Sequence, residues 1–472
     1  PRGPLYVVSA PMTRPRRLVP LQACLLMALL ALPVSAREEP REVRDSRESH
    51  EVRDDRGDRD DRSGRDADRE RDRDREPRDD DRGGGDDRSD RDDRDDDRSD
   101  DRGGDSDRGR GEDDDALSRD PLVPRADDVI AFERGGDGHE HRQGEVLMVG
   151  EAADLLGVQQ GGYRVFDPRP LEALGLVQAR VRLAPGESVA AAVERVQALA
   201  PQAAVAPNHL FSASSPAPVS APPPAGSAPR RTVVGGRIGI IDTGAEFATG
   251  PLSAVVDEAR SFTGQPYSPR EHGSVVAAIA AAQGLILGVA DVFAIDTAQR
   301  LVAPTDAIAS AVDWLVGRRY PVINISIEGP DNAVLAQVVR RAAARGVVVV
   351  AAAGNGGPAA APVYPAAYPD VVAVTAVDGD GRGYRRANRG RYIGFAALGV
   401  DVLNPFDPAA RSTVSGTSFA APRVAAEIAL RLSDQPPGSA TAVLAALRSE
   451  ARDLGEPGHD PVYGWGWIGA AR

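Results

Sequence analysis

Lysine is absent from this sequence of 472 residues, so all 57 of its basic residues are arginines. The absence of lysine excludes a lysine Schiff base, a serine–lysine dyad and the phosphate-binding lysine of a P-loop. The single cysteine, Cys24, excludes disulfides within the chain and metal sites built from cysteines. Acidic residues number 71, which gives a net charge of −14, and aromatic residues make up only 4% of the chain.

The first residues have the features of an export signal. A basic stretch precedes an apolar run over 21–32, which ends in small residues at Ala36. That run is too short to span a bilayer comfortably, whereas its length and its flanks are typical of a signal peptide. We therefore expect a signal peptide over 12–36, beginning at Met12. The mature protein would then be exported to the periplasm, cell surface or medium, without cysteine and without a membrane span.

Residues 37–116 consist almost entirely of Asp, Arg, Gly, Ser and Glu, with repeated Arg-Asp pairs. Such a segment has nothing to bury and cannot offset the entropy lost on ordering, so it is predicted to be disordered. Its charges of opposite sign are interspersed, unlike the basic arms that bind nucleic acid, and no nucleic-acid partner is expected. A solvated spacer is the simpler interpretation, and a tether to the cell envelope is the alternative.

An ordinary composition returns over 117–213, where the patterns indicate a small α+β unit. Alternating apolar residues predict strands, and Ser188 is a good cap for a helix with apolar residues at helical spacing. The expected strand, helix and strand are 177–183, 189–199 and 203–211. A linker rich in Pro, Ala and Ser follows over 214–231.

From residue 232 to 472 short apolar runs alternate with amphipathic helices. This alternation predicts one α/β domain with a parallel sheet covered on both faces. The expected strands are 237–241, 322–325, 347–352 and 371–377. The expected helices are 273–283, 306–316 and 332–345.

Three loops in this domain carry residues suited to nucleophilic catalysis. Asp242 follows a buried strand, at the end where α/β sheets place ligands. His272 opens an apolar helix. Ser418 lies in a turn of small residues, 415–422, that leads into a helix, so its hydroxyl and the helix amides would face an incoming oxyanion. Each signal is modest alone, but together they predict one site.

The order Asp, His, Ser and the sequence Gly-x-Ser-x-Ala around Ser418 resemble the subtilisin-like serine peptidase family across 237–471. The resemblance implies that Ser418 attacks the substrate carbonyl, His272 moves the proton and Asp242 orients the imidazole. It also implies that Asn355, in the Gly-Asn-Gly loop, donates to the oxyanion. The fold expected is a three-layer α/β domain with a mostly parallel central sheet, preceded by a small α+β unit.

The segment 324–330 is similar to the edge strand that pairs with the substrate backbone in this family. The resemblance implies that substrate is bound by seven residues: Ser326, Ile327, Glu328, Gly329, Ala352, Ala353 and Gly354. Glu328 stands where the family usually has glycine. It predicts a preference for basic or small residues before the scissile bond, unless its side chain points to solvent and selects nothing.

Members of this family are often made as zymogens, and 117–213 looks like a prodomain that blocks the cleft with its strand at 204–211. An unrelated accessory domain is the alternative. If the zymogen interpretation holds, autoprocessing is expected between Phe211 and Thr232, in the exposed linker. The expected partners are then polypeptide substrates and the chain's own prodomain.

No cofactor is expected to be required. Calcium is common in the family, but no Asp-rich loop here has the spacing of calcium ligands. His139 and His141 flank Glu140 without a third ligand nearby, which favours a solvated loop over a metal site.

Two classes of function follow from these patterns. The first is a secreted serine endopeptidase, made as a zymogen. The second is an inactive envelope or matrix protein in which the Arg/Asp-rich segment carries the function, as a tether or interaction segment.

Overall fold

The computed structural model describes residues 129–214, 235–407, 412–436 and 438–469, all within one compact unit. The predicted signal peptide (12–36), the Arg/Asp-rich segment (37–116) and all but the first residue of the predicted linker (214–231) lie outside the described residues.

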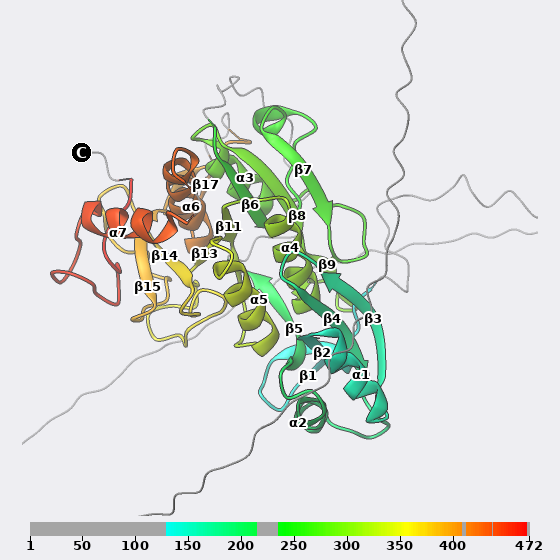
Figure 1. Cartoon of the computed structure of the whole chain (residues 1–472). Coiled ribbons are helices and arrows are strands. Elements are labelled where there is room, and N and C mark those ends of the chain that lie inside the picture. The colour runs from blue at the N-terminus through cyan, green and yellow to red at the C-terminus, as the bar shows by residue number, and fades with distance from the viewer. Residues whose placement is uncertain (1–128, 215–234, 408–411, 437, 470–472) are drawn as a thin grey trace, which may run out of the picture. The chain divides into compact units, whose positions relative to one another are not determined.

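The described part begins with an antiparallel sheet in the strand order β3-β4-β2-β5, with β1 paired to β2 (Figure 1). Two helices cover one face of this sheet. The elements are β1 (Phe132–Arg134), β2 (Glu140–Gly150), α1 (Ala152–Gln160), β3 (Arg164–Leu171), β4 (Leu176–Arg182), α2 (Val189–Leu199) and β5 (Ala204–Ala213).

Alternation along β2 explains how this sheet packs on both faces. Val146 and Met148 point into a core shared with α1 and α2. Leu147 and Val149 point the other way, into a core shared with helices of the second domain. Because successive residues of a strand face opposite sides, one strand joins the two hydrophobic cores.

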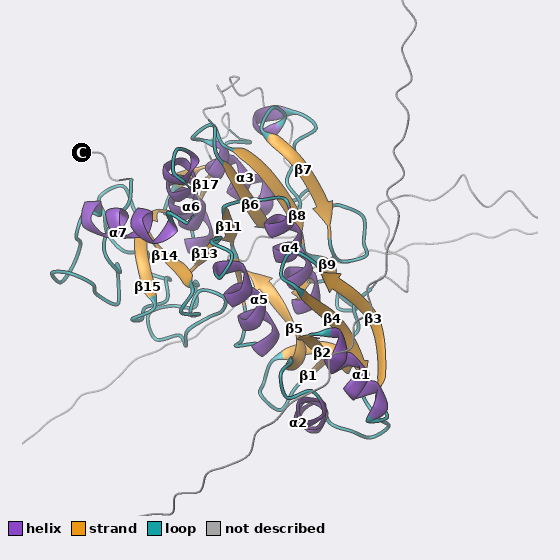
Figure 2. Ribbon diagram, viewed as in Figure 1, coloured by secondary structure: helices purple, strands orange, loops and turns teal. Residues whose placement is uncertain are grey.

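The second domain is built on a parallel sheet of seven strands in the order β15-β14-β13-β11-β6-β8-β7 (Figure 2). Its strands are β6 (Arg237–Asp242), β7 (Val256–Ser261), β8 (Ile286–Asp291), β11 (Val322–Ile325), β13 (Val348–Ala352), β14 (Val371–Val377) and β15 (Ile393–Leu398). A further two-stranded sheet joins β16 (Val402–Leu403) and β17 (Thr413–Val414), and a 3₁₀ helix spans Gly250–Leu252.

Helices cover both faces of the parallel sheet, as its continuous apolar strands require. One core joins the sheet to α3 (Glu271–Ala281) and α6 (Thr417–Ser433), and α7 (Ala440–Glu450) packs on α6. The other core joins it to α4 (Thr305–Gly317) and α5 (Ala333–Ala343). Neighbours along β13 alternate between the cores: Val350 lies in the first and Val349 in the second. The fold is the expected subtilisin-like three-layer α/β domain preceded by a small α+β unit.

Three short strands of the second domain extend the antiparallel sheet of the first. β10 (Leu301–Pro304) pairs with β5 on one side and with β9 (Ala294–Ile295) on the other. β12 (Ile327–Glu328) pairs with the end of β5. The last residues of β5 are therefore bound by the second domain.

The strands and helices expected from sequence are confirmed to within two residues at each end. Among the described residues, no helix is long and apolar enough to cross a membrane.

Candidate active site

Asp242 and His272 form a buried, hydrogen-bonded pair at the end of the parallel sheet. Asp242 is the last residue of β6, His272 lies in the first turn of α3, and their side chains are almost fully buried. The distance from His272 Nδ1 to Asp242 Oδ1 is 2.8 Å. Because a carboxylate only accepts hydrogen bonds, Nδ1 must carry the proton. In the neutral imidazole, Nε2 is then the free base.

A glycine allows α3 to approach β6 closely enough for this contact. A Cβ atom on Gly273 would lie 2.1 Å from the carbonyl oxygen of Thr243, so no other residue fits without a shift of the backbone. The amide of Gly273 also donates to Thr243 Oγ1 over 2.9 Å. The His-Gly pair thus fixes the imidazole against the carboxylate.

Ser418 lies in the first turn of α6 and is completely buried. Among the described residues, its Oγ and Nε2 of His272 are both buried atoms without a hydrogen-bond partner. The rings of His272 and Phe419 lie 5.4 Å apart, which brings the first turn of α6 beside the imidazole. Catalytic hydrogen bonds are often long until substrate is bound, so the missing contact does not argue against a Ser–His pair.

Asn355 follows β13, and its side chain is oriented by the turn that holds Ser418. The backbone N–H of Thr417 donates to Asn355 Oδ1 over 3.0 Å, and the Thr417 hydroxyl donates to the same oxygen over 3.2 Å. With Oδ1 held, Nδ2 faces β5, where it donates to the carbonyl oxygen of Ser214. Sequence reasoning missed Thr417 as the residue that orients this amide, although it stands next to Ser418.

The end of β5 lies between two short strands of the second domain, β10 and β12. Phe211 pairs with Ala303, and Ala213 pairs with Ile327. The N–H of Ser214 then donates to the carbonyl of Ser326 over 3.2 Å. Ser214 was not expected to take part, because nothing in its local sequence fixes the register of β5.

The predicted substrate segment lies along this strand. Ser326, Ile327 and Glu328 run antiparallel to 212–214. A Cβ atom on Gly329 would lie 2.3 Å from the ring of Phe211, so glycine is needed there for this ring to fit. The other three predicted residues, Ala352, Ala353 and Gly354, are buried and lead directly into Asn355.

Glu328 turns inward from β12. Its Oε2 accepts a hydrogen bond of 3.3 Å from the backbone N–H of Asn355. Burial raises the pKa of Glu328 to about 7, although this N–H and the charge of Arg386 act in the opposite direction. The side chain therefore lies at the site and does not point to solvent.

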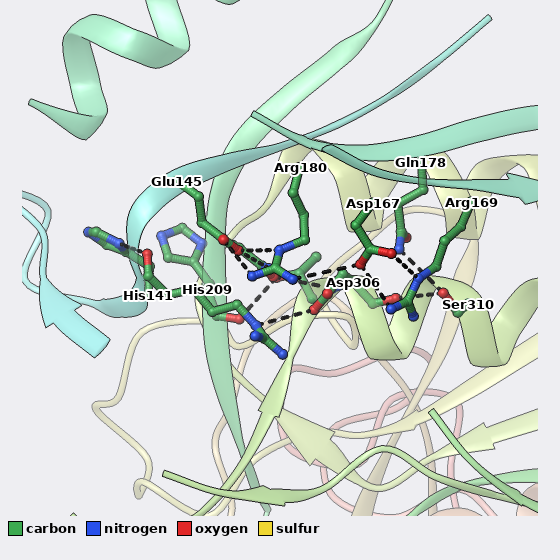
Figure 3. A network of polar contacts seen from close by, with 12 residues as sticks. His141, Glu145, Asp167, Arg169, Gln178, Arg180, His209, Asp306 and Ser310 are labelled. Atoms are coloured by element: carbon green, nitrogen blue, oxygen red, sulfur yellow. Dashed lines mark hydrogen bonds and ion pairs between the residues drawn. The ribbon is translucent and has the colours of Figure 1, made fainter. Parts of the chain in front are cut away.

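A network of charged residues joins the two domains (Figure 3). Arg180 on β4 binds Glu145 on β2 through hydrogen bonds of 2.8 and 2.6 Å. Arg142 lies 3.7 Å from Asp306 at the start of α4. Burial would raise the pKa of Asp306, but the charges of Arg142 and Arg180 hold it below its ordinary value. A fully buried carboxylate is thus kept ionised by arginines of the preceding domain.

His209 lies in the same interface and forms two hydrogen bonds as a neutral imidazole. Its Nδ1 accepts from Asn332 Nδ2 over 3.1 Å, and its Nε2 donates to Asp137 over 3.1 Å. Burial, the largest influence, lowers its pKa. The sequence-based prediction of a solvated loop is wrong for His141, which is buried in β2 with its ring 6.5 Å from that of His209. Pairing with β5 covers His141. The sequence around His141 does not predict this pairing, because the partner strand lies far away in the chain.

Within the described residues, no group of three or more His, Cys, Asp or Glu side chains could hold a metal ion. That no cofactor is required stays a prediction.

The model of the subtilase family matches residues 235–466, the part of the chain that carries Asp242, His272, Asn355 and Ser418. Subtilisin DY of Bacillus licheniformis is 36% identical over 49% of this chain and 88% of its own length. A thermostable alkaline protease of Halalkalibacterium halodurans is 31% identical over 50% of this chain and 67% of its own. The minor extracellular protease Epr of Bacillus subtilis is 29% identical over 49% of this chain and 37% of its own.

Among solved structures, fervidolysin of Fervidobacterium pennivorans, a keratinolytic enzyme related to subtilisin, has a similar fold. The TM-score is 0.56 with 20% identity, over 72% of this chain and 62% of the other. At that identity the likeness extends to the fold alone. The match of the family model and the identity to subtilisin DY, however, show that this chain belongs to the subtilase family of serine endopeptidases.

Proposed function

We propose that this chain is an exported serine endopeptidase whose reaction is carried out by Asp242, His272, Ser418 and Asn355. Ser418 Oγ attacks the carbonyl carbon before the scissile bond while His272 Nε2 takes the hydroxyl proton. Asp242 holds the imidazole through Nδ1, and Asn355 Nδ2 donates to the oxyanion. His272 then gives the proton to the leaving amine, and water releases the acyl group by the same route in reverse.

The contact between Asn355 Nδ2 and the carbonyl oxygen of Ser214 is the observation that carries this proposal. It supports a role for this amide as an oxyanion donor, because a peptide carbonyl on an antiparallel strand is its partner. The buried hydroxyl of Ser418 and the free base of His272 supply the remaining groups. The test is hydrolysis of a peptide by the purified enzyme, with the Ser418→Ala variant as control. Hydrolysis by both proteins at equal rates would refute the assignment.

The same contacts support a zymogen, with 117–213 as the prodomain. β5 fills the substrate strand position between β10 and β12, so another peptide cannot pair there at the same time. Ser214 would be the residue before the scissile bond, since its carbonyl meets Asn355 and its N–H meets Ser326. We propose that the chain is cut between Ser214 and Ser215.

Export rests on the predicted signal peptide over 12–36, which lies outside the described residues. The relative named as an extracellular protease agrees with it. The alternative function, an inactive envelope or matrix protein, is not favoured, because the relatives are proteases and no catalytic side chain expected by the family is missing.

Asn355→Ala is expected to lower kcat by about 10²–10³-fold and to leave KM nearly unchanged. The reason is that an oxyanion donor stabilises charge that develops only in the transition state. This loss in kcat is the one known for a subtilisin that lacks the corresponding asparagine. Steady-state kinetics on a peptide substrate measure both constants. A rise in KM at constant kcat would instead make Asn355 a ground-state binding residue.

Acid is expected to hasten release of the cleaved prodomain, through His209. Its pKa is lowered in the interface, so protonation costs binding energy there. The contribution of His209 to prodomain binding is complete above pH 6.5, its ordinary pKa, and falls as the pH drops below that value. The lag before peptide hydrolysis should therefore be shorter at pH 5 than at pH 7.5. The His209→Gln variant should lose this difference; an equal difference in the variant would exclude His209.

A further inference from the structure

Glu328 lies next to the residue whose carbonyl would be attacked. Two contacts fix Ser214 there: its N–H donates to Ser326 on one side, and its carbonyl accepts from Asn355 Nδ2 on the other. The residue is 1% exposed. Ser326 and Asn355 thus contact Ser214 from two sides, and we call the space between 326–328 and the turn 352–355, beside Ser214, the primary pocket.

The carboxyl group of Glu328 joins the two segments that bound the primary pocket. Glu328 belongs to β12, and its Oε2 reaches the backbone N–H of Asn355 over 3.3 Å. That N–H belongs to the same residue whose side chain binds the Ser214 carbonyl. A glycine at 328 would leave the space between the two segments open, whereas glutamate places a carboxyl group in it.

We infer that Glu328 fills the primary pocket and makes this enzyme cleave after small, uncharged residues such as serine, alanine and glycine. The inference rests on the proposed function, because it concerns the substrate of the same site. It names the class of peptide that the enzyme accepts.

Bulk, more than charge, explains this selection. The carboxyl group already accepts the Asn355 N–H, so an arginine would have to displace this contact to enter. Because burial raises the pKa of Glu328 to about 7, the carboxyl is half protonated near neutral pH and offers an arginine less than a full counter-charge. A phenylalanine would need the volume that the carboxyl occupies.

The chain's own strand agrees with this preference. Ser214, the residue that occupies the position, is small and uncharged, and Ala213 and Ser212 before it are small as well. Phe211, three positions before Ser214, is large and fully buried and lies against Gly329. The strand is thus anchored by an aromatic ring three positions before Ser214, at the end of the segment 326–329.

The test uses peptides with the sequence of 210–217, Leu-Phe-Ser-Ala-Ser-Ser-Pro-Ala, in which Ser214 is kept or replaced by Phe or Arg. The processed wild-type enzyme is expected to prefer the serine peptide over the phenylalanine peptide by about 10²-fold in kcat/KM, the range a closed pocket gives. In Glu328→Gly and in Glu328→Ala this ratio should fall at least tenfold. Glu328→Gln is the matched control: it keeps the bulk without the charge, so the ratio should stay near the wild-type value.

The pH dependence of cleavage distinguishes selection by bulk from selection by charge, independently of the variants. Glu328 is protonated below about pH 7 and ionised above it, so selection by charge would favour the arginine peptide increasingly between pH 6 and 8.5. Selection by bulk predicts the same ratio of serine to phenylalanine cleavage at both pH values. A preference for arginine that Glu328→Gln abolishes, or equal cleavage after serine and phenylalanine, would overturn the inference. Failure to cleave any of the peptides would instead count against the proposed function.

Discussion

Ser418→Ala and His272→Ala are each expected to lower kcat by about 10⁶-fold, the size known for a subtilisin that loses its serine or histidine. The two groups act as a unit, because the hydroxyl is a poor nucleophile unless the imidazole takes its proton. The double variant should therefore be no less active than either single one. Because these variants are not expected to cut themselves, the linker 214–231 of each is first cut by an added protease, which is then removed. Residual hydrolysis of a peptide substrate, measured at high enzyme concentration, then gives the three values.

Ser415→Ala is the matched control for Ser418→Ala. Ser415 lies in the same turn, but its hydroxyl accepts a hydrogen bond of 2.9 Å from the N–H of Asp401 and lies outside the site. Its removal should leave kcat within a few fold of the wild type. If the double variant lost activity as the product of the two single losses, Ser418 and His272 would be acting independently and the mechanism would be wrong.

Wild-type protein is expected to cut itself after Ser214, so that its largest fragment begins at Ser215, whereas Ser418→Ala should remain uncut. The reason is that the strand 211–214 already pairs with β10 and β12, and its last carbonyl meets Asn355. Such prior positioning replaces a bimolecular encounter by an intramolecular step. Amino-terminal sequencing and the intact mass of the fragments identify the bond.

The outcome distinguishes three accounts of the first domain. A new terminus at Ser215 in wild type alone supports a prodomain that is cut by its own enzyme. Identical fragments from wild type and Ser418→Ala would assign the cut to another protease. A terminus near Thr232 in wild type alone would mean that the contact between Ser214 and Asn355 is not the arrangement that reacts.

The sequence predicts several elements of the core, because their signals are local. α5 carries an apolar stripe and begins after Asn332, whose side chain accepts from the N–H groups of Val334 and Leu335. Strands such as β14 are continuous apolar runs. The positions of Asp242, His272 and Ser418 follow from their motifs, and the structure brings Asp242 and His272 into contact.

The expected strands leave out several that the structure shows, among them the central strands β2 and β8. For β3 and β7 the reason is that they lie at sheet edges, where polar residues and prolines are tolerated. β3 contains two prolines and two arginines, and β7 reads Val-Asp-Glu-Ala-Arg-Ser. Neither has the apolar run or clean alternation that identifies a strand in sequence.

Register and side-chain direction could not be predicted, because they depend on distant partners. That Ser214 meets Asn355 depends on pairing between residues far apart in the chain. The departure from glycine at Glu328 is visible in the sequence, but its contact with the Asn355 N–H is not. The network around Asp306 likewise joins arginines of one domain to a helix of the other.

The central claim is that Ser418 is the nucleophile, and a fluorophosphonate probe tests it most directly. The probe reacts covalently with an activated serine, and mass spectrometry of the digested, processed enzyme locates the label. We predict one labelled residue, Ser418, with labelling retained in Ser415→Ala. A processed enzyme that hydrolyses peptides yet carries no label, or carries it on another serine, would contradict the account.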